Sequence, residues 1–535
     1  MPQVYAWVVD PLIKVFPRDR RDTRAPTAAV IEAARNDVES AQVALRCTAA
    51  ATVHAIVSPV VHADGDDRID EVRLSRVGCV HLDAQTADIP KAHLVRAAPG
   101  PFPDVLLNAD ELHLGPNETQ SLWITVAVPA TAKPGAYRGQ LTLTSGREST
   151  QVPIELTVYG VAVPRERTYR LSQWMSADTV LARHIPGASY PSETFFRTLR
   201  NIARNMRAHR QNVLRLPFGP AANGPIMAMP TGIDGLAFDF TGFDRFVDVF
   251  TEAGAADVIA GAPLAAQSAI DPGTVQVAGL LNAGGCIAAV NLRPEAPEAK
   301  HFLDHYLAAL YHHLQLRGLT GRYVQHVLDD PEDGHAGLYQ ALAARVRALM
   351  PGIPICDAAA SIKVAGETDT AAPPLDYYLD HQRWYRDRQR EGREVWVSLP
   401  GRLTGRFPNR FIDRSLLDLR LVHWMSLAFG ATGLMHRGYN EWEADDVTRQ
   451  ACVAGRPGGD AWIVYPMIEG VLDSIRHEAM RDGVEDYELL RLLSEDHPRQ
   501  ALSLVKAVVK SGTNYTASVN TFRRTRRQLL ELLSG

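Results

Sequence analysis

The sequence lacks the features that mark several large classes of protein. No stretch of its 535 residues reaches the roughly 18–20 consecutive apolar residues that a membrane-spanning helix needs. The start of the chain has neither the basic segment nor the apolar run of a signal peptide. We therefore expect no membrane partner and, for the chain as written, a cytoplasmic location. A periplasmic or secreted protein whose leader had been trimmed would look the same.

Cysteine is also scarce. The five cysteines are far apart and form no CxxC or Cys/His pair with metal-ligand spacing, so we expect free thiols, no metal and no other cofactor. The net charge of -5 argues against a nucleic-acid partner. The chain contains no GxxxxGK[ST] phosphate loop, no GxSxG nucleophile turn and no HExxH zinc motif. Reactive groups must therefore be sought among other polar residues.

The first 165 residues indicate a β domain. Short runs of alternating apolar and polar residues, such as 121–128 and 139–144, are separated by turn signals such as Gly115-Pro116-Asn117. Strands of this kind are typical of an antiparallel β-sandwich. Pro153 in the last run predicts that this strand begins there or lies at a sheet edge.

After residue 165, strands and helices alternate. The segment Lys300 to Arg317 places its apolar residues on one helical face, and the apolar run 323–328 follows as a strand. Repeated units of this kind over roughly 300 residues favour a (β/α)8 TIM barrel. We expect a multidomain protein with three parts: a β-sandwich over 1–165, a barrel catalytic domain over 166–490, and a C-terminal segment over 491–535, with helix from about Ser474 onward.

Two adjacent carboxylates stand where a barrel would place its active site, at the C-terminal end of a strand. The apolar strand ending at Leu328 runs directly into Asp329 and Asp330, and Pro331 should end it. Two neighbouring carboxylates in a partly dry pocket cannot both ionise cheaply. One pKa should therefore rise and keep an acid available near neutral pH. The alternative is a solvated acidic loop that caps the next helix.

Further polar and aromatic residues follow other expected strands. Aromatic rings can stack on sugar faces, and Asn, Arg and His can hydrogen-bond hydroxyl groups. We expect substrate contacts from Tyr377, His436, Arg437, Tyr439, Asn440 and Trp442. The alternative is that these are incidental loop or core residues. The polar segment His209 to Asn212 precedes a strand, which favours packing at the bottom of the barrel.

Several motifs along nearly the whole chain match those of one known family. In the first domain, the matching segment is Ala34 to Gln42. In the second, the matching segments are Leu328-Asp329-Asp330-Pro331 and the stretch from Gly433 to Trp442. The most specific match is the long motif Ser474-Ile-Arg-His-Glu-Ala-Met-Arg-Asp-Gly-Val-Glu-Asp-Tyr-Glu488. On these segments the chain resembles glycoside hydrolase family 123, the β-N-acetylgalactosaminidases.

The resemblance implies a glycosidase that releases a terminal β-linked N-acetylhexosamine, GalNAc or GlcNAc, from an oligosaccharide or glycoconjugate. In the implied retaining mechanism, the acetamido carbonyl of the substrate attacks the anomeric carbon. By motif, Asp329 would polarise the acetamido group, and Asp330 would be the acid/base where the family has Glu. Arg437 stands where the family usually has an aromatic residue, and a cation there could prefer an anionic or highly hydroxylated glycoside.

Two alternatives stay open. The chain could be a glycosidase of altered specificity that acts without acetamido participation, or a non-catalytic carbohydrate-binding relative. The sequence leaves the oligomeric state open.

Overall fold

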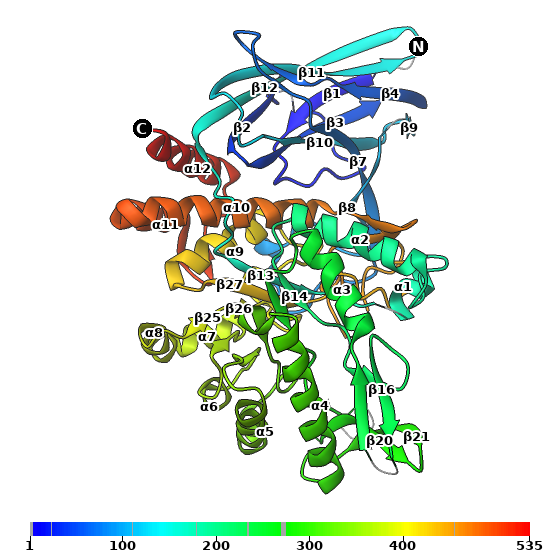
Figure 1. The fold of residues 1–535 in the computed structure, drawn as a ribbon. Coiled ribbons are helices and arrows are strands. Elements are labelled where there is room, and N and C mark those ends of the chain that lie inside the picture. Colours follow the sequence, from blue (N-terminus) through cyan, green and yellow to red (C-terminus); the bar gives the residue numbers. More distant parts are fainter. Residues whose placement is uncertain are drawn as a thin grey trace.

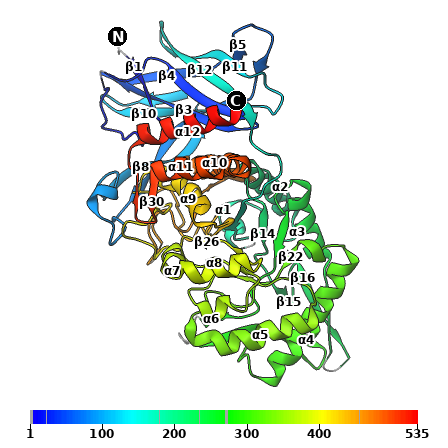
Figure 2. The ribbon, with the colours of Figure 1, turned by 90° about the vertical axis from the view of Figure 1, so that its left-hand side faces the viewer.

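The structure is a computed structural model that describes residues 4–22, 24–109, 111–177, 179–232, 235–268, 274–453 and 455–535. A β-rich N-terminal region lies at one end of the molecule, and a larger region of strands and helices lies at the other (Figure 1). Between them run helices α10 (Ile475–Asp496), α11 (Pro498–Val508) and α12 (Val519–Ser534) (Figure 2). The protein is therefore multidomain, as expected.

Two sheets form the β-rich region. One has the order β1-β3-β10-β7-β8, and the other β2-β12-β11-β4-β9 with β5 and β6 beside β11. The bounds are β1 (Val4–Val9), β2 (Ala29–Arg35), β3 (Val38–Cys47), β4 (Ala51–Val57), β5 (Val60–His62), β6 (Arg68–Ile69), β7 (Val72–Leu82), β8 (Gly100–Asn108), β9 (Glu111–Leu114), β10 (Thr119–Ala127), β11 (Gly135–Ser145) and β12 (Glu148–Ala162). Apolar residues of both sheets share one buried core, to which Val43, Ile124 and Leu156 belong.

One strand pair of this region departs from the expected antiparallel arrangement. β2 and β12 run parallel, whereas β11 and β12, which a tight turn joins, are antiparallel. A tight turn forces the two strands that it joins to run antiparallel. β2 and β12 can run parallel, because they lie far apart in the chain and no hairpin connects them.

The larger region contains three sets of parallel strands, with orders β13-β27-β26, β14-β18-β22 and β23-β24-β25. Single parallel bridges join Gln325 to Ile355 and Pro374 to Ser398, which links the sets. The bounds are β13 (Arg170–Trp174), β14 (Val213–Arg215), β18 (Val258–Ala260), β22 (Tyr323–Val324), β23 (Cys356–Asp357), β24 (Thr370–Ala371), β25 (Glu394–Val395), β26 (Val397–Ser398) and β27 (Gly433–Arg437).

Side chains from all three sets meet in one small core. Its buried members are Trp174, Val213, Ala260, Cys356, Ala372, Trp396 and Met435, and Val324 packs against them. The strand sets therefore face a common centre. Because their pairings are parallel, their C-terminal ends lie on the same side.

The helices and remaining hairpins alternate with these strands. The helices are α1 (Thr179–His184), α2 (Glu193–Ala208), α3 (Thr241–Glu252), α4 (Pro297–Leu316), α5 (Ala336–Leu349), α6 (Ile362–Ala365), α7 (Leu375–Asp380), α8 (Gln382–Arg390) and α9 (Leu416–Phe429). The smaller strands are β15 (Pro220–Ala221), β16 (Ile226–Thr231), β17 (Gly235–Asp239), β19 (Ala266–Gln267), β20 (Val275–Ala283), β21 (Cys286–Leu292), β28 (Tyr465–Met467) and β29 (Gly470–Leu472). The segments β16–β17 and β20–β21 extend beside α4 (Figure 1).

The C-terminal part is not helical throughout. The boundary expected at residue 490 falls inside α10, and the strands β30 (Val509–Ser511) and β31 (Asn514–Tyr515) separate α11 from α12. The expectation of uninterrupted helix is wrong here, because Gly512 and Thr513 reverse the chain in a hairpin. Within the part of the chain that the structure describes, no helix has both the length and the apolar character needed to cross a membrane.

Candidate active site at the strand ends

Asp329 and Asp330 stand at the C-terminal end of a strand, as the sequence predicts. Leu328 forms a parallel bridge with Ala265, and the Asp329 backbone N–H donates to the Ala265 carbonyl at 3.1 Å. Asp330 then adopts a left-handed backbone with φ of 51°, which Asp tolerates better than most residues. The chain turns away at this point and leaves Asp329 half-buried and Asp330 at the surface.

The surroundings of Asp330 suit a proton donor. Partial burial, and next the negative charge of Asp329, raise the pKa of the Asp330 carboxyl above its ordinary value. The cations Arg402 and Arg437 oppose this rise without cancelling it. The protonated carboxyl therefore persists to higher pH than in a free aspartate, which is the property that general acid catalysis needs.

Arg437 joins the second predicted motif to this carboxylate pair. It ends β27, where it lies opposite Trp174 of β13 in the parallel register. Its Nη1 is 3.7 Å from Oδ2 of Asp329, and its Nε donates to Oε1 of Glu441 at 2.8 Å. The side chain is 61% exposed, so it can also meet a ligand.

His436 and Tyr377 occupy more enclosed positions. His436 is buried, with its Nε2 3.4 Å from Oδ1 of Asp460. Burial, and next the charge of Arg410, lower the pKa of His436 to about 4, so the imidazole is neutral at physiological pH. Tyr377 is half-buried; its hydroxyl accepts from the backbone of Ile362 at 3.1 Å, and its ring stacks on His381 at 4.2 Å between centroids.

The other three predicted sugar contacts are fully buried and have partners within the protein. The Tyr439 hydroxyl donates to the Asn205 side chain at 2.7 Å, and the Trp442 indole donates to the Val464 carbonyl at 2.9 Å. The Asn440 amide is bonded in both directions to the backbone of residue 176, at 2.8 and 2.9 Å. These contacts fix the loop that follows Arg437. Direct sugar contact by these three residues stays a prediction.

Sequence reasoning did not single out three other residues near the carboxylates. Trp174 ends β13, Arg215 ends β14, and His326 lies between β22 and Asp329. The Arg215 guanidinium lies 4.2 Å from the Trp174 ring centroid, and the Trp174 and His326 rings meet edge to face at 5.7 Å. The available signal was positional, because Trp174 and Arg215 are the last residues of short strands.

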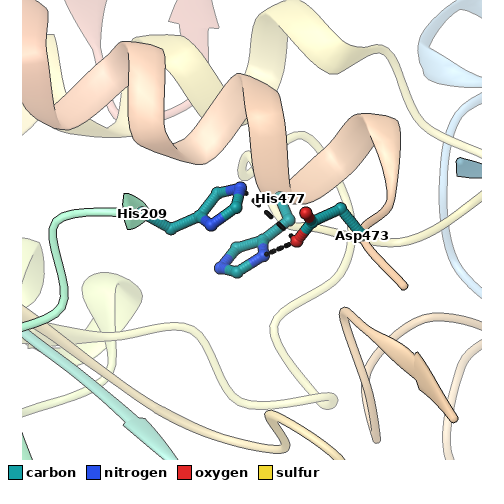
Figure 3. Close-up of side chains that lie close together, drawn as sticks. All are labelled: His209, Asp473 and His477. Carbon is teal, nitrogen blue, oxygen red and sulfur yellow. Dashed lines mark hydrogen bonds and ion pairs between the residues drawn. The ribbon is translucent and has the colours of Figure 1, made fainter. Parts of the chain in front are cut away.

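One group of side chains elsewhere has the composition of a metal site. His209, Asp473 and His477 meet where α2 ends and α10 begins (Figure 3). Nδ1 of His477 lies 3.0 Å, and Nε2 of His209 lies 3.5 Å, from the same oxygen of Asp473. These residue types, at these distances, could in principle surround a cation.

The ring geometry of this group favours hydrogen bonding instead. The two imidazoles stack face to face, with 3.6 Å between centroids and 9° between planes. An imidazole nitrogen binds a metal in the plane of its ring, and two nearly parallel planes at this separation do not converge on one ion. Asp473 therefore serves as a shared acceptor that joins α10 to the segment before β14, consistent with the packing role predicted for His209 to Asn212.

Comparison with known proteins defines the class of this molecule. The family model described as the glycoside hydrolase 123 catalytic domain matches residues 174–493, and the model described as the glycoside hydrolase 123 N-terminal domain matches residues 69–145. The protein is therefore a glycosidase, and its substrate is a carbohydrate. Because the catalytic-domain match alone spans more than half of the chain, the chain belongs to glycoside hydrolase family 123.

One solved structure agrees at the level of the fold. A family 123 glycoside hydrolase from Clostridium perfringens, studied for glycolipid glycan hydrolysis, is 15% identical with a TM-score of 0.77, over 99% of this chain and 97% of that chain. A β-galactosidase from the psychrophilic Marinomonas ef1 is 10% identical with a TM-score of only 0.38, over 63% and 62% of the two chains. No curated protein matches this chain.

Proposed function

We propose that the protein removes a terminal β-linked N-acetylhexosamine, GalNAc or GlcNAc, from an oligosaccharide or glycoconjugate by substrate-assisted, retaining hydrolysis. The pair Asp329 and Asp330 carries this proposal, because it stands at a strand end and one of its carboxyls has a raised pKa. Membership of family 123 supports the glycosidase class, and the acetamido-dependent chemistry is the further step proposed here.

In this mechanism the two carboxyls have different roles. Asp329 accepts a hydrogen bond from the acetamido N–H and holds the acetamido oxygen toward the anomeric carbon. Asp330 protonates the leaving oxygen, and its carboxylate later takes a proton from the water that opens the oxazolinium ring. The left-handed backbone at Asp330 offers an adjustment by which a side chain one methylene shorter than glutamate can reach the same oxygen.

We further propose that the parallel strands close into a (β/α)8 barrel over residues 166–490, between a β-sandwich over 1–165 and a C-terminal segment over 491–535 whose helices are separated by the β30–β31 hairpin. The linked strand sets support closure, because the single bridges continue the pairing from one set to the next. The common core with members from all three sets supports it as well. Asp329, Asp330 and Arg437 would then share the C-terminal face of the barrel.

A second candidate function is hydrolysis without acetamido participation. The cations near the carboxylates favour it, because Arg215 and Arg437 contribute positive charge that a neutral N-acetylhexosamine does not require. In that case Asp329 would act as nucleophile or base. Equal rates on aryl glycosides with and without the 2-acetamido group would favour this candidate over the first.

The acid role of Asp330 has a direct test. Asp330→Asn should lower kcat on an aryl N-acetyl-β-hexosaminide by at least roughly 100-fold, the scale of lost general acid–base catalysis. Asp70→Asn, the same change at an exposed carboxylate of the β-rich region, is the matched control and should keep its activity. NMR of the first-formed sugar reports the anomer, and retention of the β configuration is expected. Near-normal turnover by the Asn variant would remove Asp330 from the mechanism.

A further inference from the structure

Arg215 differs from the other arginines that lie over aromatic rings. Among the described residues there are five such arginines. Four of them pair with a carboxylate: Arg96, Arg245, Arg388 and Arg420. The Arg215 side chain has no hydrogen bond or ion pair with any residue that the structure describes, and its Nε is buried without a partner. The five N–H donors of this guanidinium therefore have no acceptor among the described residues.

The position of the unpaired Arg215 cation is energetically unfavourable. Burial lowers the pKa of Arg215 to about 10, although the charge of Asp329 opposes the change. The side chain therefore remains charged at neutral pH while it has lost much of its hydration. Arg215 is half-buried, and charges that have lost hydration in proteins are normally paired, because desolvation without a partner is unfavourable. An unpaired charge at the C-terminal end of a strand indicates that a group of the ligand is its partner.

The position of Arg215 identifies that ligand with the substrate. Trp174 and Arg437 lie opposite each other on β13 and β27, and the Arg215 guanidinium rests on the Trp174 ring. Arg437 lies 3.7 Å from Asp329, so all three side chains belong to the same end of the strand sets. The indole Nε1 of Trp174 is a second buried donor without a partner in the described chain. Two unused donors therefore stand beside the carboxylate pair.

We propose that Arg215 binds an anionic substituent, a carboxylate, sulfate or phosphate, on the sugar that sits at Asp329 and Asp330. The proposal rests on the proposed function, since only a sugar at the carboxylate pair brings its substituent to Arg215. The planar guanidinium fits two oxygens of such a group at once, and the Trp174 ring supports it from one side. Arg437 contributes charge but already donates to Glu441, so Arg215 is the specificity-determining residue.

Binding of matched sugars tests this assignment without requiring turnover. Calorimetry at constant ionic strength would compare N-acetylgalactosamine with its 6-sulfate and 6-phosphate, and galactose with galacturonate. The wild-type protein should bind at least one anionic member roughly tenfold or more tightly than its neutral partner, the scale of a charged hydrogen bond. Whichever pair shows the difference identifies the substituent.

Two variants locate the preference. Arg215→Gln should abolish it with little change in the affinity for the neutral sugars. Arg96→Gln removes another arginine stacked on a ring, over Phe16, and should leave the preference intact. Thermal unfolding of both variants confirms that they are folded, which is expected for Arg215→Gln because its side chain has no hydrogen bond or ion pair to lose.

The outcomes separate this inference from the proposed function. Equal affinity for every neutral and anionic pair, or a preference that survives in Arg215→Gln, would overturn the anion site even if the aryl hexosaminide is hydrolysed. A loss of turnover on neutral substrate in Arg215→Gln, with the anion preference unchanged, would assign Arg215 to positioning Asp329 and would equally overturn it. Anion preference in a protein that hydrolyses none of the glycosides would instead remove the proposed function and leave the site.

Discussion

At the scale of single residues, the proton on Asp330 depends on neighbours of both signs. Asp329 and Glu332 raise its pKa, whereas Arg402 and Arg437 lower it, and burial exceeds each of these effects. A general acid works only while protonated, so kcat/KM should fall as the pH rises through the pKa of Asp330. The high-pH limb of the activity profile therefore reports this residue.

Arg437→Gln should move that limb to higher pH. The substitution removes a cation that favours the ionised carboxylate, so the pKa of Asp330 rises and the acid keeps its proton longer. Because Arg437 is largely exposed, solvent screens its charge and we expect the shift to be small. The measurement is the pH dependence of kcat/KM, with Arg449→Gln at an exposed surface position as control. A shift toward lower pH would contradict the charge assignment.

The sequence predicted the residue types of the site better than it predicted how exposed those residues are. An acidic pair after an apolar strand predicts a strand-end site, and Asp329 and Asp330 are found there. Tyr439 and Trp442 have the chemistry of sugar contacts, yet both are buried against other parts of the chain. Burial depends on loops that fold back from distant segments, and a local pattern does not contain that information. Sequence reasoning did not single out Arg215, because the feature that distinguishes it is the lack of a hydrogen-bond or ion-pair partner for its side chain. Only the structure shows that feature.

At the scale of elements, the contact between α9 and α10 depends on a glycine. Gly483 lies in the middle of α10, where a Cβ would meet the His423 ring of α9, with Cγ of that ring 3.1 Å away. His423 is buried, and burial lowers its pKa to about 4, so the ring is neutral and packs as an uncharged group. The close approach of the two helices therefore requires a residue without a side chain.

Gly483→Ala should destabilise the protein even though alanine favours helix. The added methyl group overpacks the helix contact by about 1–3 kcal/mol, which outweighs a propensity gain of about 1 kcal/mol. Gly337→Ala in α5 is the matched control, since its Cβ would meet nothing within 4 Å, and it should stabilise slightly. Urea denaturation measures both. Equal stabilisation by the two changes would show that the helices can separate without cost.

Elements with strong periodicity were predictable, and short ones were not. The helix expected over 300–317 is found as α4 (Pro297–Leu316), because its apolar face repeats over five turns. The hairpin β20–β21 was missed, since β21 is largely exposed and has no buried face to show in its sequence pattern. Pro153 is paired with Gln140 of β11, and the parallel pairing of β12 with β2 begins only at Ile154. The prediction that the strand begins at Pro153 is wrong, because β12 begins at Glu148. β12 also lies between β2 and β11 rather than at the edge of the sheet, and only its part before Ile154 lacks a second neighbouring strand.

At the scale of the whole molecule, buried charges join the two ends of the structure. Arg420 of α9 is fully buried and donates to Asp486 at 2.7 Å, to Asp482 at 3.1 Å and to Glu39 of the β-rich region at 2.5 Å. Arg526 of α12 donates to Asp486 at 2.7 Å. The long motif from residue 474 to 488 is therefore structural in large part, because its charged residues hold the domains together.

Arg420→Met should destabilise the molecule strongly. It keeps much of the side-chain volume but leaves three buried carboxylates without their shared cation, a loss of about 3–5 kcal/mol. Arg68→Met breaks an exposed pair with Asp70 and, as the control, should cost at most about 1 kcal/mol. Chemical denaturation followed by circular dichroism gives both values. Similar small losses would mean that the network carries little of the stability.

The domain layout was predictable from pattern changes along the chain, whereas the junction was not. A shift from alternating strands to strand–helix units near residue 165 is visible in the sequence, and family resemblance extends across it. The sharing of α10 by both regions depends on pairs such as Arg210 with Glu485, 275 positions apart. Contacts of that separation leave no local trace in composition or periodicity.

The span of the charge network bears on how the chain matures during synthesis. Asp37 accepts from Arg526 at 2.9 Å, 489 positions later. A nascent chain can form its β-rich region early, but the carboxylates of α10 cannot acquire the Arg526 cation until α12 has emerged from the ribosome. Completion of the charge network thus awaits the synthesis of α12, and ribosome-bound chains halted before Arg526 should remain sensitive to protease at the domain junction.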